Sequence, residues 1–159
     1  MPNDTALREH LVKLLEGGSA HATFDSAVSK FPPDRIGVRP KGMPYSAWEL
    51  LEHIRIAQED ILRFSISAEH ESPKWPEAYW PASPAPEKQS HWARSVKAIR
   101  KDLAEFQALV RDPKQDLYRK FAWGDGQTLL REALLIADHN SYHIGQLVLV
   151  RRLLGVWPK

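Results

Sequence analysis

The chain has 159 residues, of which 43% are apolar and 26% are charged, a composition that predicts one globular domain over residues 1–159. Its 22 basic and 20 acidic side chains leave a net charge of +2, and the basic residues are scattered, so we expect no nucleic-acid-binding surface. Cysteine is absent, which excludes disulfides, thiolate ligands and a cysteine nucleophile. We see neither a signal peptide nor an apolar run near the roughly 20 residues that span a bilayer, so we expect a cytoplasmic protein without a membrane segment.

The N-terminal part of the chain predicts one helix followed by a loop. Apolar residues recur at helical spacing over residues 5–31. Within this stretch Gly17-Gly18 interrupts the pattern and would kink or loosen the helix, because each glycine costs about 1 kcal/mol relative to alanine. Residues 32–45 are rich in proline and glycine and predict a loop.

A second helix is predicted to begin after Ser46. Glu49 lies three residues further on, which completes the pattern of a capping box. Apolar residues then follow a 3.6-residue period to about residue 68, and their wide face predicts a central position. Residues 70–87 are rich in tryptophan and proline, so we expect an ordered connection packed onto the domain rather than a flexible linker.

Two further helices are predicted in the C-terminal half. The third covers about residues 87–110 and ends before Asp112-Pro113, and residues 113–127 read as irregular. The fourth extends from about residue 128 to residue 154, and Gly155 suits the position after its C-terminus. No strand pattern competes. The fold class predicted is therefore all-α, an up-down or crossover four-helix bundle with one long connection between its second and third helices.

Two histidines four residues apart provide the first sign of a functional site. On a helix, His139 and His143 stand one turn apart on the same face, where both imidazoles can reach one metal ion. They make half of a site, since a bound transition metal needs three or four ligands. The residue after His139 is Asn140 and not glutamate, which argues against the chemistry of the HExxH metalloproteases.

His53 is the best third ligand, because it lies among apolar residues on the helix expected to be most buried. The other histidines lie on polar stretches and are expected at the surface: His10, His21, His70 and His91. A divalent cation would satisfy three buried ring nitrogens together, each of which costs about 1–3 kcal/mol if left unpaired. The alternative is a hydrogen-bonded polar network without a metal.

The remaining ring nitrogens of a metal site usually donate to nearby acceptors. Asp60, Glu132 and Gln146 are spaced to lie on the same helix faces as the three histidines. Glu132 and Asp60 are also candidates for a general base, and Tyr142 for a proton donor if its side chain points inward. Tyr142 could equally be a packed aromatic. The aromatic residues of the 70–87 connection could wall a substrate pocket or simply fill a gap in the fold.

The chain resembles the DinB-like superfamily, small bacterial four-helix proteins that include DinB/YfiT-type proteins and thiol-dependent transferases. The resemblance depends on residues 48–53, residues 139–147 and the closing motif at residues 151–155. It implies a divalent metal, nickel or zinc, held by His53, His139 and His143 with a position left open. Three imidazoles also suit iron or manganese.

This resemblance implies a metal-dependent enzyme, often a homodimer, that activates water or a low-molecular-weight thiol and then transfers, isomerises or hydrolyses a small substrate. Many members of the family have no assigned reaction. Two other interpretations remain open for this chain. One is a metal-binding or stress-related dimeric helical protein without catalysis, and the other is a dimerising helical module without a metal.

Overall fold

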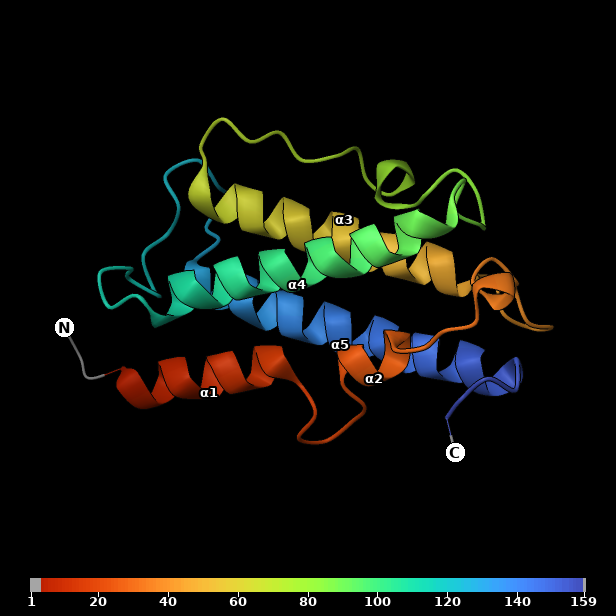
Figure 1. The fold of residues 1–159 in the computed structure, drawn as a ribbon. Coiled ribbons are helices and arrows are strands. Elements are labelled where there is room, and N and C mark those ends of the chain that lie inside the picture. Colours follow the sequence, from red (N-terminus) through yellow and green to blue (C-terminus); the bar gives the residue numbers. More distant parts are fainter. Residues whose placement is uncertain (1–3, 159) are drawn as a thin grey trace.

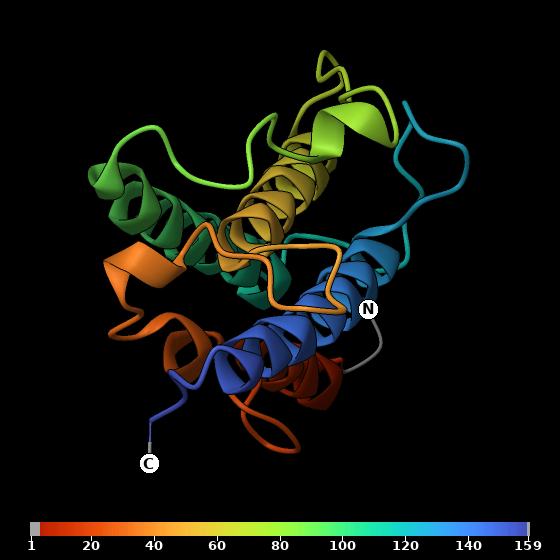
Figure 2. The ribbon, with the colours of Figure 1, turned by 90° about the vertical axis from the view of Figure 1, so that its right-hand side faces the viewer.

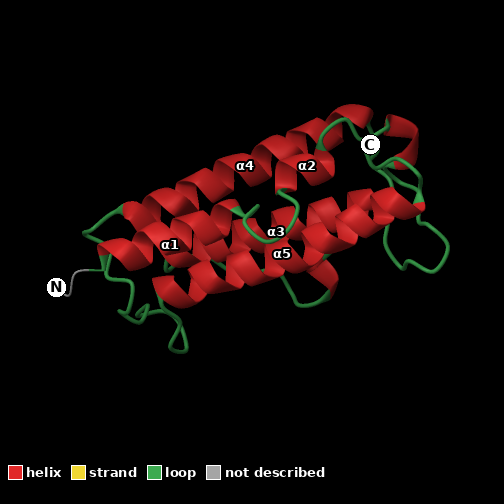
Figure 3. Ribbon diagram, turned by 90° about the horizontal axis from the view of Figure 1, so that it is seen from below, coloured by secondary structure: helices red, strands yellow, loops and turns green. Residues whose placement is uncertain are grey.

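The computed structural model describes residues 4–158, and all of its regular elements are helical (Figure 3). The structure contains five α-helices, which are α1 (Thr5–Glu16), α2 (Phe24–Val28), α3 (Ala47–Ile66), α4 (Gln89–Arg111) and α5 (Leu129–Leu153). Two single turns of 3-10 helix are η1 (Pro33–Arg35) and η2 (Glu77–Tyr79). In the described residues, no helix is long and apolar enough to cross a membrane.

The four long helices form a bundle. α3 packs against α4 and α5, and α1 packs against the same two helices from the other side, so α1 and α3 lie diagonally opposite. α3 and α4 run in the same direction, whereas α1 and α5 run in the opposite one (Figure 1). Two parallel neighbours need a connection that returns along the whole bundle, and residues 67–88 provide it on the outside of α3 (Figures 1 and 2). The bundle is therefore of the crossover type.

The predicted helix over residues 5–31 is wrong in one respect, because it is two helices and not one. Gly17 and Gly18 have φ angles of +70° and +84°, a left-handed backbone that ends α1 at Glu16. The chain restarts as α2 after Thr23, whose Oγ1 accepts a hydrogen bond from the Ser26 N–H at 3.1 Å. The periodicity continues across the break because both helices pack against α5, α1 over one apolar cluster of the core and α2 over the other.

α3 begins and packs as predicted. The Ser46 hydroxyl accepts from the Glu49 N–H at 3.2 Å, and the Glu49 carboxylate accepts from the Ser46 N–H at 2.8 Å, so the capping box is complete. Leu50, Leu51 and Leu62 are fully buried. The helix is therefore central, as its wide apolar face predicted.

The core has two apolar clusters, placed one after the other along the bundle. The first gathers around α2 and the N-terminal half of α3, and its largest members are Phe31, Trp48, Leu50, Ile54, Trp92 and Leu147. The second gathers around α1 and the C-terminal halves of α3 and α4, and its members include Leu11, Leu62, Phe106, Leu117 and Ile136. Along α3 and along α5, polar residues lie between the residues of the first cluster and those of the second.

Two buried arginines hold the ends of helices that lie far away in sequence. Arg151, with 1% of its surface exposed, donates to the carbonyls of Ser26, Ala27 and Ser29 at 3.0 Å each, where α2 ends. Arg8 donates in the same way to the carbonyls of Val110 at 2.7 Å and Asp112 at 3.0 Å, at the end of α4. Both side chains satisfy carbonyls that a helix leaves unpaired at its C-terminus.

The substitution Arg151→Met should lower the free energy of unfolding by about 3 kcal/mol, because it leaves several carbonyls unpaired while keeping much of the side-chain volume. The matched control is Arg152→Met at the adjacent, exposed position, which should change stability by no more than about 0.5 kcal/mol. Urea unfolding of both variants measures the difference. Equal and small losses would show that the carbonyl contacts of Arg151 contribute little.

Candidate metal centre

Three histidines meet in the polar layer between the two apolar clusters. His53 projects from α3, and His139 and His143 project from successive turns of α5. One ring nitrogen from each residue lies within 4.8 Å of the other two. The closest pair is Nε2 of His53 and Nε2 of His139, 3.0 Å apart. The helical spacing of the α5 pair and the isolated position of His53 on α3 therefore converge as the sequence predicted.

The outer nitrogens of two rings have fixed roles. His53 Nδ1 lies 2.9 Å from the backbone carbonyl of Tyr79, and His143 Nδ1 lies 2.7 Å from Oε1 of Gln146. A carbonyl oxygen only accepts, so in both rings Nδ1 carries the hydrogen and Nε2 presents a lone pair to the centre. This is the tautomer that a metal-binding histidine needs when Nε2 is the ligand.

The third ring is incompletely satisfied by the protein. Within residues 4–158, His139 Nδ1 is buried without a hydrogen-bond partner. The contact between Nε2 of His139 and Nε2 of His53 would be repulsive if both nitrogens presented lone pairs with nothing between them. One of the two must carry a proton, or a cation must be shared between them. The site thus has more acceptors than the protein has donors.

This donor set fits a divalent transition metal. Zinc binds imidazole nitrogen at about 2.0–2.1 Å, which in a tetrahedral site places ligand nitrogens roughly 3.4 Å apart. The separations here, from 3.0 Å to at most 4.8 Å, bracket that value. Three imidazoles with two oriented outer nitrogens could therefore hold one ion with small movements of the rings.

Burial keeps the three rings neutral. Burial, followed by the charge that a protonated His53 would carry, lowers the pKa of His139 to about 4. Burial, followed by the charge that His139 would carry, lowers the pKa of His143 to about 4 as well. Burial also lowers the pKa of His53. Near neutral pH all three rings are therefore in the deprotonated form that binds metals.

The long connection between α3 and α4 covers one side of the centre. Trp80 stacks on the His53 ring with centroids 4.0 Å apart and planes 1° apart, and its indole also stacks on Tyr45 at 4.3 Å. Tyr79 beside it is buried. Trp75 is 68% exposed, and its ring meets the edge of Tyr79 with centroids 5.2 Å apart. The connection is thus packed onto the domain as its composition predicted, with Trp80 as the residue that meets the histidines.

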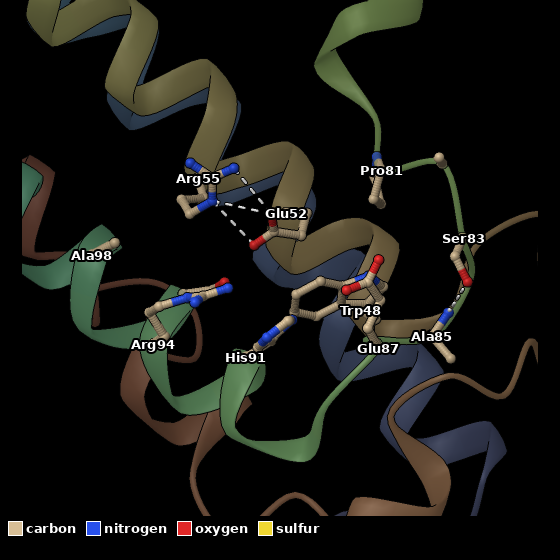
Figure 4. A pocket seen from close by; sticks show the side chains of 12 residues that line it. Trp48, Glu52, Arg55, Pro81, Ser83, Ala85, Glu87, His91, Arg94 and Ala98 are labelled. Carbon is tan, nitrogen blue, oxygen red and sulfur yellow. Dashed lines mark hydrogen bonds and ion pairs between the residues drawn. The ribbon is translucent and has the colours of Figure 1, made fainter.

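A groove of about 500 Å³ lies beside this cover, between α3 and α4 (Figure 4). His91 and Arg94 of α4 point into it toward Trp48 and Glu52 of α3, and Pro81 forms part of its wall (Figure 4). None of the three histidines lines the groove. It is therefore a neighbouring feature that shares the connection with the metal centre but not its ligands.

The residues predicted around the histidines have different positions. Gln146 contacts His143 directly. Asp60 contacts none of the three rings; its carboxylate oxygens meet Nε2 of His70 at 2.7 Å and the hydroxyl of Tyr79 at 2.5 Å. The prediction that His70 is a surface residue is therefore wrong, because Asp60 holds it in a half-buried position.

The other two candidates, Glu132 and Tyr142, are not hydrogen-bonded to the three histidines in the described part of the chain. Glu132 is 2% exposed and pairs with Arg131 at 2.8 Å, and burial raises the pKa of its carboxyl group. Tyr142 is 65% exposed, and its ring meets the edge of His143 with centroids 5.0 Å apart. Among the described residues, no carboxylate is hydrogen-bonded to the three histidines.

Sequence reasoning did not find two polar contacts of this layer. The Asn140 amide donates to Oε1 of Gln58 at 2.8 Å, and the Gln58 amide donates to the carbonyl of Ile99 at 2.8 Å. These bonds connect α5, α3 and α4 next to the histidines. The available signal was the position of Gln58 midway between Ile54 and Leu62 on the apolar face of the helix, since a polar side chain buried there requires partners.

The chain belongs to the DinB superfamily, whose sequence model matches residues 18–147. The match covers most of the chain and includes His53, His139 and His143. The family resemblance predicted from the sequence motifs is therefore confirmed. Comparisons with curated proteins and with solved structures gave no significant match.

The depressed histidine pKa values predict that the metal-free protein loses stability as the pH falls from about 6.5 to about 4. The unfolded chain takes up protons near the ordinary histidine pKa of about 6.5, whereas the folded rings resist them until the pH nears 4. In the substitution His139→Gln, the slope of unfolding free energy against pH should be smaller by up to about 1.4 kcal/mol per pH unit.

Urea unfolding at several pH values in the presence of a chelator measures this slope. The control is His10→Gln, which changes an exposed histidine on α1 and should leave the slope unaltered. An unchanged slope in the His139→Gln variant would contradict the assignment of this ring as neutral and buried.

Proposed function

We propose that His53, His139 and His143 bind one divalent metal ion, nickel or zinc, and that the protein uses it as a metal-dependent enzyme acting on a small substrate. One observation carries this proposal. Three imidazole nitrogens converge within 4.8 Å, and two of the rings have their outer nitrogens oriented by acceptors. Such an arrangement supports metal binding more than a closed polar network, because Nε2 of His53 and Nε2 of His139 meet at 3.0 Å, where a shared cation could take the place of a shared proton.

The chemistry follows from the neutral ligand set. A divalent ion held by three imidazoles keeps its full double charge and lowers the pKa of a thiol or water at its open position. The chain's own residues hold this set in place: Tyr79 and Gln146 orient His53 and His143, and Trp80 covers one face of the His53 ring. Burial keeps the rings deprotonated so that they are ready to act as ligands.

A low-molecular-weight thiol is the nucleophile that the site supports best. In the described part of the chain, no carboxylate contacts the three rings, and Asp60 and Glu132 have other partners. A nucleophile held here would therefore have to lose its proton without a carboxylate of the described residues beside it. A thiol with a pKa of about 8.5 needs a much smaller shift to ionise near pH 7 than water, whose pKa is 15.7. We propose thiol-dependent transfer or isomerisation ahead of hydrolysis.

The metal-binding part of the proposal predicts about one nickel or zinc ion per chain after native purification or incubation with either metal. Mass spectrometry of metal content measures it. The variants His53→Ala, His139→Ala and His143→Ala should each lose the ion, because two remaining imidazoles seldom retain a divalent metal. His10→Ala is the matched control and should keep it. A wild-type chain that takes up no ion would overturn the proposal.

The thiol part of the proposal is tested with cobalt(II) as a spectroscopic substitute. Addition of 2-mercaptoethanol to the cobalt-loaded protein should produce an intense near-ultraviolet charge-transfer band, since a thiolate would join the metal at the open position. The apparent pKa of this binding should lie below that of the free thiol. A cobalt spectrum that does not respond to thiols would support a closed, structural metal instead, and the homodimeric binding protein would become the better interpretation.

A further inference from the structure

Tyr79 contacts α3 at both of its ends. Its backbone carbonyl accepts the hydrogen bond from Nδ1 of His53 at 2.9 Å, and its phenol donates to Oδ2 of Asp60 at 2.5 Å. Asp60 follows His53 by seven residues, which is two helical turns and roughly 10 Å along the helix axis. A single tyrosine therefore spans two turns of α3, with its backbone end on one of the three converging histidines.

The direction of each bond in this arrangement is determined. Burial, and then the hydrogen bond to Asp60, raise the pKa of the Tyr79 phenol, so the phenol keeps its proton and acts as the donor. The second carboxylate oxygen of Asp60 meets Nε2 of His70 at 2.7 Å. Asp60 thus uses both oxygens to hold the connection that follows α3, at His70 and again at Tyr79.

His53 and His143 depend on acceptors of different rigidity. Gln146 lies on α5 itself, one turn after His143, so helix geometry alone keeps it near the ring. The acceptor for His53 is a backbone carbonyl at the end of η2, a single 3-10 turn within the long connection of residues 67–88. No helix hydrogen bond of α3 places that carbonyl. The hydrogen bond from the Tyr79 phenol to Asp60 fastens this turn to α3.

We propose that Asp60 and Tyr79 are positioning residues for the metal centre. Their hydrogen bond holds the Tyr79 carbonyl against Nδ1 of His53, which keeps His53 in the tautomer whose Nε2 faces the other two histidines. The same anchor holds the neighbouring Trp80 on the His53 ring. This inference depends on the proposed metal-binding function. In it Asp60 holds Tyr79 in place and does not act as a general base.

The test uses Tyr79→Phe, which removes one hydroxyl and keeps the ring and the backbone carbonyl. The dissociation constant for zinc, measured by competition with a chromophoric chelator, should rise by up to about tenfold, because the carbonyl that orients the metal-bound histidine would be held less firmly. In the metal-free protein, the ¹⁵N shifts of the His53 ring should move from the Nδ1–H tautomer toward a mixture. Tyr118→Phe is the matched control, because that tyrosine is exposed on the 113–127 segment.

Two variants of Asp60 test the other partner of the same hydrogen bond. Asp60→Ala should weaken zinc binding as much as Tyr79→Phe, whereas Asp60→Asn retains an oxygen that accepts the phenol hydrogen and should recover part of the affinity. A Tyr79→Phe protein with lower thermal stability but an unchanged zinc constant and an unchanged His53 tautomer would overturn the inference, since the bond would then be only structural.

Failure of the proposed function has a different signature. A wild-type chain that binds no zinc would remove the metal, yet the His53 tautomer would still be readable in the metal-free protein. A change of that tautomer in Tyr79→Phe would then still support the positioning of His53 by Tyr79 and Asp60. An unchanged tautomer would contradict it.

Discussion

The burial of three imidazole rings in one layer of the core is the constraint on which the rest of this structure depends. Each buried ring nitrogen needs a partner, at a cost of about 1–3 kcal/mol where none is present. Tyr79 and Gln146 satisfy two outer nitrogens, and the inner nitrogens are left facing one another. An interior of this kind is stable around a shared cation or a shared proton, and burial makes protonation of the rings themselves unfavourable.

The topology of the bundle is linked to this layer. Because α3 and α4 are parallel, the chain between them has to return along the outside of α3 (Figures 1 and 2). That path passes directly over His53, where Trp80 stacks on the ring and Tyr79 binds its outer nitrogen. A segment that the fold requires as a connection therefore also completes the environment of a histidine. An up-down bundle with short loops would have no residue available for this purpose.

The distribution of carboxylates around the site separates two kinds of metal chemistry. In a hydrolase that activates water, a side-chain base within hydrogen-bonding distance of the water usually accepts its proton. Here the two carboxylates predicted as candidate bases have other partners: Asp60 holds the connection, and Glu132 forms an ion pair with the exposed Arg131. A metal held by the three histidines would offer Lewis acidity without a carboxylate of the described residues hydrogen-bonded beside it. This combination suits a nucleophile that is already acidic, and it explains why a thiol is the better candidate.

The sequence by itself determined the helices, the capping box at Ser46 and the faces on which His53, His139 and His143 lie, because these features depend on residues within one or two turns. The tryptophan- and proline-rich composition of residues 70–87 also indicated a connection that packs onto the domain, as it does at Tyr79 and Trp80. Only the tertiary structure decided that the first helix is broken at Gly17, that Asp60 braces Tyr79, and that Arg151 holds the end of α2 from 124 residues away in sequence. Such contacts depend on how helices are placed relative to one another, and the spacing within any one helix carries no information about that placement.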